Sequence, residues 1–162
     1  MKYFKHPTAI IDDSVNIGED AKIWHFTHIS KNVKIGNRVI IGQNVFVGED
    51  VIIGNGCKIQ NNVSIFKGVI LENDVFISPS VVFTNVKKPR AFIEQKNNFK
   101  KTLVRKGATI GANSTIISGL TIGEYSMIGA GSLVTKNIKS YKLAIGSPCR
   151  EVYNINEKGE KI

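Results

Sequence analysis

The chain has 162 residues and a mass of 17.8 kDa, with 42% hydrophobic and 22% charged residues, so we expect one folded domain and neither a disordered nor a fibrous chain. No apolar run reaches the roughly 18 residues of a membrane helix, and the N-terminus shows no signal-peptide pattern, which favours a cytoplasmic protein without membrane contacts. The net charge of +9 is concentrated in residues 86–106, which hold eight basic residues and one acidic residue; this local patch predicts an anionic ligand, and not a nucleic acid.

From Ile11 onward, a large apolar residue recurs at every sixth position as far as Phe83, and the pattern resumes at Val104. The fifth position of each hexad is small or β-branched, and the fourth favours Asn, Asp or Gly, which tolerate the positive φ of a tight corner. A period of six fits neither a helix nor one alternating sheet. It predicts a parallel β-helix of short strands joined by corners. The first positions are Ile11, Ile17, Ile23, Ile29, Ile35, Ile41, Val47, Ile53, Ile59, Ile65, Leu71, Ile77, Phe83, Val104, Ile110, Ile116, Ile122, Ile128 and Val134.

This pattern resembles the left-handed parallel β-helix of the hexapeptide-repeat transferases over nearly the whole chain. The resemblance implies triangular coils of three hexads, and therefore six to seven coils. It also supplies the left hand, because the general rule for parallel crossovers favours the right hand. We expect a β-helix domain over residues 1–145, with a loop inserted at residues 84–103, and a short C-terminal extension over residues 146–162.

In a strict repeat, functional residues should appear as departures from the pattern. The third hexad position carries His25, Gln43 and Asn61 at intervals of 18, which stacks them in one polar column if each coil has three hexads. The inserted loop carries most of the net charge, and long loops on rigid scaffolds are usually functional. Asn85 leads the chain into that loop. We expect Gln60 and Asn61 to lie on the wall nearest the loop.

Several strings sharpen the resemblance: IWHFTHIS, GQNVFVG, KIQNNVSIFKGVILENDVFISPSVVFTNVKKPRA and IGSPCREV. Together they look like the N-acetyltransferases that act on the 3-amino group of nucleotide-linked sugars. The UDP-2-acetamido-3-amino-glucuronate enzymes look more similar than the relatives that act on dTDP-linked 3-amino-3,6-dideoxyhexoses. The resemblance implies acetyl-CoA as the donor, a homotrimer with active sites between neighbouring prisms, and a role in making surface-glycan precursors.

By the same resemblance, Asn85 occupies the place of an asparagine close to the reacting amine. An amide is no base at neutral pH, but it can orient the amine by accepting a hydrogen bond. His25 is the alternative base, although its column places it two coils, or about 10 Å, from Asn61.

The acceptor sugar nucleotide carries hydroxyl groups, a pyrophosphate and, for a glucuronate, a carboxylate. The amides of Gln60 and Asn61 suit sugar hydroxyls, and Arg90 can hold a pyrophosphate or carboxylate bidentately. Glu94 could accept a hydrogen bond from an acetamido N–H or a hydroxyl. These four residues are the predicted acceptor-binding set.

On the donor side, pantetheine is expected along the later coils, with its amides paired to the main chain near Gly129, Ala130 and Gly131. Lys136 and Arg150 are candidates for the coenzyme phosphates. The string from Gly146 to Arg150 stands where the family usually has Gly-Asn-Pro-Ala-Lys, so its Ser and Cys are departures.

Three alternatives stay open. A metal enzyme like the γ-class carbonic anhydrases would need three converging histidines, whereas this chain has only His6, His25 and His28; we expect no metal. A non-catalytic β-helix assembly module would bind no acetyl-CoA. A sugar O-acetyltransferase of the same fold would need a true base.

Overall fold

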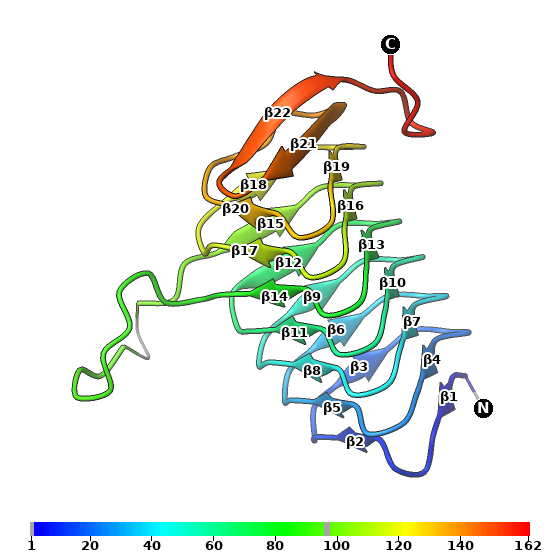
Figure 1. The fold of residues 1–162 in the computed structure, drawn as a ribbon. Helices are drawn as coiled ribbons and strands as arrows, with labels where there is room; N and C mark the ends of the chain where they lie inside the picture. Colours follow the sequence, from blue (N-terminus) through cyan, green and yellow to red (C-terminus); the bar gives the residue numbers. More distant parts are fainter. Residues whose placement is uncertain (1, 96–97) are drawn as a thin grey trace.

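The computed structural model describes residues 2–95 and 98–162, which form a three-sided prism of stacked coils without any helix. Strands of sheets A, B and C line the three sides (Figure 1). Sheet A holds β1 (Phe4–Lys5), β4 (Lys22–Ile23), β7 (Ile40–Ile41), β10 (Lys58–Ile59), β13 (Phe76–Ile77), β16 (Thr109–Ile110), β19 (Met127–Ile128), β21 (Lys142–Gly146) and β22 (Cys149–Asn154). Sheet B holds β2 (Ile10–Ile11), β5 (His28–Ile29), β8 (Phe46–Val47), β11 (Ser64–Ile65), β14 (Val82–Phe83), β17 (Thr115–Ile116) and β20 (Leu133–Val134). Sheet C holds β3 (Asn16–Ile17), β6 (Lys34–Ile35), β9 (Ile52–Ile53), β12 (Val69–Leu71), β15 (Thr102–Val104) and β18 (Thr121–Ile122).

The strands pair in parallel with the strands of the next coil, and the register is 18 residues: Ile41 pairs with Ile59, and Ile59 with Ile77. The chain winds as the predicted left-handed β-helix (Figure 1). The predicted six to seven coils are too few, because sheet A has eight parallel strands from β1 to β21. The count started at Ile11 and therefore missed β1, where the polar Lys5 occupies the first hexad position.

The interior is a ladder of aliphatic side chains. The first-position residues from Ile23 to Val134 and the valines of the fifth positions are almost fully buried, and the small fifth-position side chains let the corners close over the ladder. Cys57 replaces a valine in this ladder; burial raises the pKa of its thiol to about 11, so the thiol stays protonated at neutral pH.

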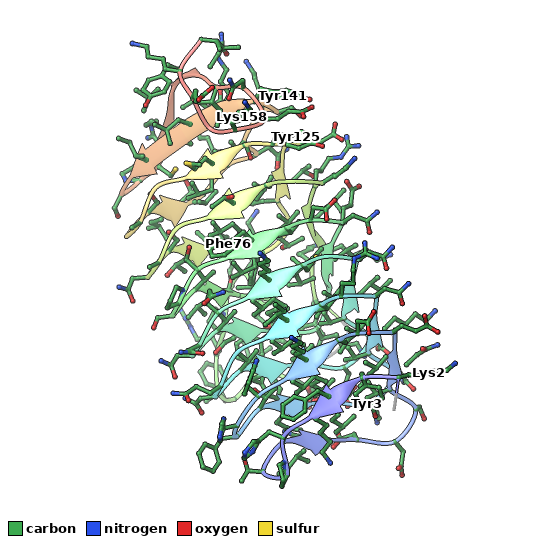
Figure 2. The ribbon with its side chains drawn as sticks, turned by 90° about the vertical axis from the view of Figure 1, so that its right-hand side faces the viewer. Lys2, Tyr3, Phe76, Tyr125, Tyr141 and Lys158 are labelled. Atoms are coloured by element: carbon green, nitrogen blue, oxygen red, sulfur yellow. The ribbon has the colours of Figure 1, made fainter. Side chains whose placement is uncertain are left out.

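Corners join the sheets, and the fourth hexad position turns each of them with positive φ. Asn62 (φ 61°) and Asp74 (φ 60°) follow the expected residue preference, but Phe26, Arg38 and Tyr125 adopt the same conformation. The corner therefore imposes this conformation on residues that rarely choose it. Figure 2 shows Tyr125 beside Tyr141 near the C-terminal end of one corner column, and the two rings stack with centroids 5.5 Å apart.

Three corner names are used below. The AB corner, between sheets A and B, comprises residues 6–9, 24–27, 42–45, 60–63, 78–81, 111–114 and 129–132. The BC corner comprises residues 12–15, 30–33, 48–51, 66–68, 84–101, 117–120 and 135–137. The CA corner comprises residues 18–21, 36–39, 54–57, 72–75, 105–108, 123–126 and 139–141.

The inserted loop leaves the prism at the BC corner after β14 and projects far from it (Figure 1). It ends where β15 begins at Thr102, two residues before the predicted end of the insertion. Lys96, one of its basic residues, lies outside the described residues. At the other end of the chain, β21 and β22 form an antiparallel hairpin over the last coil. The described ranges contain no helix that could span a membrane.

The buried ladder predicts unequal costs for two isoleucines on adjoining strands. Ile59 is fully buried, whereas Ile52 is 40% exposed on the outer face of sheet C. Ile59→Ala should lower the free energy of unfolding by about 2–5 kcal/mol because it leaves a cavity, and Ile52→Ala by less than about 1 kcal/mol. Urea unfolding followed by circular dichroism measures both; equal losses would contradict this interior.

Candidate functional site

The AB corner differs from the other two because it carries no charged side chain. Its seven segments, from residues 6–9 to residues 129–132, contain no Asp, Glu, Lys or Arg. The BC corner holds the ion network of Lys31, Glu49 and Lys67, and the CA corner includes Glu72 and Arg105. A neutral strip of amides, glycines, histidines and hydroxyl groups therefore runs up one edge of an otherwise charged prism.

A cavity of about 300 Å³ opens on this strip, lined by Trp24, His25, Ile40, Gly42, Gln43, Ile59, Gln60 and Asn61. The predicted polar column of His25, Gln43 and Asn61 therefore lies on one corner, as the spacing of 18 requires. Trp24, Gly42 and Gln60 occupy the second hexad position of three successive coils. The missing side chain at Gly42 opens a notch between the indole below and the amide above.

Asn61 has a structural task as well as a place in the cavity wall. Its Oδ1 accepts a hydrogen bond from the backbone N–H of Gln43, one coil below, at 3.0 Å. A Cβ atom on residue 42 would lie 2.5 Å from that Oδ1, so the close approach of the coils requires glycine there. Because its oxygen is occupied, Asn61 turns to ligands mainly as a donor through Nδ2.

His25 stacks on His6 of the first coil, with ring centroids 3.5 Å apart. Burial and the nearby charge of His25 hold the pKa of His6 below its usual 6.5. Two imidazoles in contact disfavour simultaneous protonation. At neutral pH, therefore, His6 is neutral at the lower end of the cavity.

Asn85 lies at the neck of the inserted loop. The backbone N–H of Lys100 donates to the Asn85 carbonyl at 3.3 Å and closes this neck, while Thr84 Oγ1 accepts from the Ser118 N–H at 3.0 Å. Within the described ranges, the half-buried side-chain amide of Asn85 has no hydrogen-bond partner, and the buried Ser118 hydroxyl lacks one too. Unsatisfied polar groups are uncommon in folded proteins and often mark functional positions.

Arg90 and Glu94 lie on the projecting part of the loop, where both are exposed. Arg90 donates through Nη1 to the carbonyl of the preceding Pro89 at 2.9 Å, so its guanidinium group keeps further donors for an anion. A second hollow of about 310 Å³ lies beside it, lined by Val86, Pro89, Arg90, Ala91, Ile93 and Gln95.

The predicted donor-binding residues fall on the upper coils. Gly129, Ala130 and Gly131 form the uppermost AB corner segment, on the same column as Asn61 and three coils above it. The backbone N–H of Ala130 and that of Ala112 below it have no acceptor among the described residues. Two donors therefore point along this corner, as a ligand with amide carbonyls would require.

Lys136 and Arg150 lie apart from that segment. Lys136 is exposed on the BC corner just after β20, on the same corner as Asn85. Arg150 is exposed on β22, and its Nη1 donates to the carbonyl of Cys149 at 2.9 Å.

One expectation about the site is wrong. Gln60 and Asn61 do not lie on the wall nearest the loop, because they sit on the AB corner and the loop leaves the BC corner. In a single coil, Pro79 on the AB corner and Asn85 on the BC corner are six residues apart, which is roughly 15–20 Å along sheet B. Within one chain, the structure therefore separates Asn85, Arg90 and Glu94 from the cavity.

Two features of the cavity escaped the sequence analysis. The His6–His25 stack was missed because His6 precedes the first recognised hexad, although extending the phase backward past Ile11 would have revealed it. The role of Gly42 as the floor of a notch was hidden because glycine is common at the second position. Among the described residues, no three His, Cys, Asp or Glu side chains are grouped to hold a metal ion.

Comparison with known families gives two matches. The family of bacterial transferase hexapeptides (six repeats) matches residues 14–49 and 101–136, and the hexapeptide repeat of succinyl-transferases matches residues 32–67. Together they cover more than half of the chain.

Curated relatives share shorter stretches. A dTDP-3-amino-3,6-dideoxy-α-D-galactopyranose 3-N-acetyltransferase from Aneurinibacillus thermoaerophilus is 58% identical over 53 residues, which is 33% of this chain and 28% of that protein. A galactoside O-acetyltransferase from Lactococcus lactis is 40% identical over 62 residues, or 38% of this chain and 30% of that protein. The matches thus span less than a third of these relatives' own lengths.

Among solved structures, a mutant of the N-acyltransferase AntD from Bacillus cereus, in complex with dTDP and coenzyme A, is similar with a TM-score of 0.64. The similarity covers 94% of this chain and 80% of that one at 21% identity. At this identity, the likeness concerns the fold.

The histidine stack makes a prediction that NMR can check. His25→Asn should raise the pKa of His6 toward 6.5, because it removes a neighbouring positive charge and opens the ring to water. A histidine-ring titration measures the shift. His28→Asn is the control, since His28 contacts Asp12 and Phe46 instead, and it should leave His6 unchanged. An unmoved His6 in the His25→Asn protein would contradict the stack.

Proposed function

Because this chain belongs to the bacterial hexapeptide-repeat transferases, we propose that it transfers an acetyl group from acetyl-CoA to the 3-amino group of a nucleotide-linked amino sugar. The strings that resemble 3-amino-sugar N-acetyltransferases support this reaction, and so does the relative named for the same 3-N-acetylation. The proposed setting is the synthesis of surface-glycan precursors in the cytoplasm.

The observation that carries the proposal is the division of the predicted site between two corners. The AB corner has the amides of Gln60 and Asn61 below and the free N–H groups of Ala112 and Ala130 above. The BC corner has Asn85 and its loop, and Lys136 two coils higher. Each corner thus offers groups for both an acceptor and a donor, so two prisms packed edge to edge would complete one site.

This arrangement favours a homotrimer. A three-sided prism that places its AB corner against the BC corner of a neighbour makes a heterologous contact, and such contacts close into a ring when the rotation is right. Three copies would form three equivalent sites. In each of them, Asn85, Arg90 and Glu94 come from one subunit and the cavity comes from the next.

The chemistry needs little from side chains. The nitrogen lone pair of the sugar amine attacks the thioester carbonyl carbon, the C–S bond breaks, and the amine proton passes to the departing thiolate or to water. Holding the two reactants together supplies much of the rate, worth up to about 7–11 kcal/mol in favourable cases. Asn85 accepts a hydrogen bond from the amine and orients its lone pair, and backbone N–H groups stabilise the oxyanion.

The remaining predicted residues take complementary roles. Arg90 binds the pyrophosphate or a sugar carboxylate, and Glu94 accepts a hydrogen bond from the sugar. Gly129, Ala130 and Gly131 pair with pantetheine, while Lys136 and Arg150 bind the coenzyme phosphates.

A sugar O-acetyltransferase is the second candidate, favoured by the Lactococcus lactis relative and by the histidine stack beside the cavity. A hydroxyl group is a poor nucleophile without a base, and His25 is the imidazole in the cavity wall. His25→Asn should therefore abolish O-transfer but leave N-transfer largely intact.

Asn85→Ala tests the reaction directly. Thiol release from acetyl-CoA is measured against UDP- and dTDP-linked 3-amino sugars, with 4-amino and hydroxyl analogues as controls. The variant should lose at least about tenfold in kcat, because the amine is no longer oriented, while gel filtration shows an unchanged assembly. Asn98→Ala, in the same loop, is the matched control and should keep full activity. An unimpaired Asn85→Ala protein would place the chemistry elsewhere.

A shared site predicts rescue between inactive subunits. Asn85→Ala and Gln60→Ala damage opposite halves, so co-expressed subunits in a mixed ring should regain up to about a quarter of the wild-type kcat/KM. Purification through two different affinity tags isolates the mixed assemblies. Mixtures no more active than the parent variants would show that each site lies within one chain.

A further inference from the structure

The notch over Gly42 is larger and more specific than sugar hydroxyl groups require. We propose that this notch binds the uracil or thymine ring of the nucleotide-linked substrate, stacked on Trp24 and read by Gln60 and Asn61. This inference rests on the proposed function and assigns it a nucleotide class: UDP or dTDP in place of a purine or cytidine nucleotide.

The walls of the notch have the spacing of a single flat ring. Trp24 and Gln60 leave the prism from the same hexad position two coils apart, which is about 9.6 Å because neighbouring coils pair at 4.7–4.9 Å. A flat ring in van der Waals contact with both walls needs about 7–8 Å. Gly42 sends no side chain into this gap, and any Cβ there would collide with Asn61.

The indole is prepared for stacking. Phe4, one coil below, packs against Trp24 with ring centroids 5.3 Å apart, and the His25 ring lies nearly parallel to it at 6.1 Å. Trp24 nevertheless stays 38% exposed and borders the cavity. A rigid, supported and exposed aromatic face is the usual platform for a nucleobase, and such stacking is sequence-tolerant. The choice of base must therefore come from hydrogen bonds.

The amides beside the indole supply that choice. Asn61 Oδ1 is held by the backbone of Gln43, which leaves Nδ2 as a donor, and the Gln60 side chain has no partner among the described residues, so it offers one donor and one acceptor. The pair thus presents donor, acceptor, donor. Its complement is acceptor, donor, acceptor, which is the O4, N3–H, O2 edge of uracil and thymine. Cytosine, adenine and guanine each place a donor where this pair would place another.

The absence of charge on the AB corner fits the same ligand. A pyrimidine base is neutral at pH 7, so a wall of amides and an indole can desolvate it at little cost, whereas the phosphates need cations. Those cations lie on the inserted loop, at Lys87, Lys88 and Arg90. From Gly42 to Ala112 the corner rises by three coils, about 14 Å, which leaves room for the phosphates and sugar between the base and the donor site.

The chain contains a single tryptophan, so its fluorescence reports stacking at Trp24 directly. The intact protein is titrated with UDP, dTDP, CDP, GDP and ADP, and calorimetry gives the dissociation constants. UDP and dTDP should quench the fluorescence and bind at least about tenfold more tightly than the other three. Equal binding of all five, or binding of UDP and dTDP without quenching, would overturn the assignment.

Variants separate the two contacts. Trp24→Ala and Gln60→Glu should each raise the KM for the sugar nucleotide by about tenfold or more, consistent with the loss of a stacked base, and leave the KM for acetyl-CoA unchanged. Phe26→Ala removes a neighbouring exposed aromatic residue outside the cavity and should change neither. Unchanged KM values for Trp24→Ala and Gln60→Glu would refute the notch as the base site.

The thiol-release assay keeps this inference distinct from the proposed function. Acetylation of a GDP-linked amino sugar alone would preserve the transfer reaction and overturn the pyrimidine site. Tight UDP binding with Trp24 quenching, but no thiol release from any sugar of the panel, would preserve the pyrimidine site and overturn the reaction.

Discussion

The prism depends on one constraint: each coil must hydrogen-bond, residue for residue, to the coil 18 residues away. Backbone N–H groups of one coil meet carbonyls of the next, as when Asn62 N–H donates to Gln43 O and Ser80 N–H to Asn61 O. This register forces positive φ at the fourth hexad position, even on Phe26 and Tyr125. It also brings Gly42 against Asn61 so closely that no side chain fits. The notch is therefore a consequence of coil stacking.

The same constraint limits where function can be placed. The first and fifth hexad positions fill the core, and the fourth turns the corner, so ligands meet mainly the second, third and sixth positions. On the AB corner, the second and third positions depart from the usual small or acidic residues at Trp24, His25 and Gln60. Specificity is thus carried by a few residues at 18-residue intervals on one edge.

The fold was largely predictable because its period is short and repeated. The six-residue pattern gave the parallel coils, the buried ladder and the corner residues, but Lys5 interrupted it at the first coil, so the coil count fell short. The position of the loop relative to the column was missed for an arithmetic reason. Thr84 follows Gln60 by 24 residues, which is one coil plus one side of the prism, so the loop leaves the next corner.

The pairings inside the site were less accessible to sequence reasoning. The separation of Asn85 from Asn61 is visible only when the faces of the prism are tracked, and its remedy, a second subunit, is not written in one chain. The hydrogen bond that occupies Asn61 Oδ1 decides which atoms of that residue a ligand can use. No pattern of residue types at the corner would have indicated that engagement.

Coil stacking also explains why the positive charge is on a loop and not on the wall. Side chains at one position of successive coils stand about 4.8 Å apart, and two like charges about 4 Å apart repel by about 1 kcal/mol even in water. The charged positions of the BC corner respect this limit, since Lys31, Glu49 and Lys67 alternate in sign with N–O distances of 3.4 and 3.5 Å. A column of cations able to hold a pyrophosphate would weaken the stack that carries it. Placing those cations on an ejected loop removes the penalty, and leaves the neutral corner to discriminate by shape and hydrogen bonding.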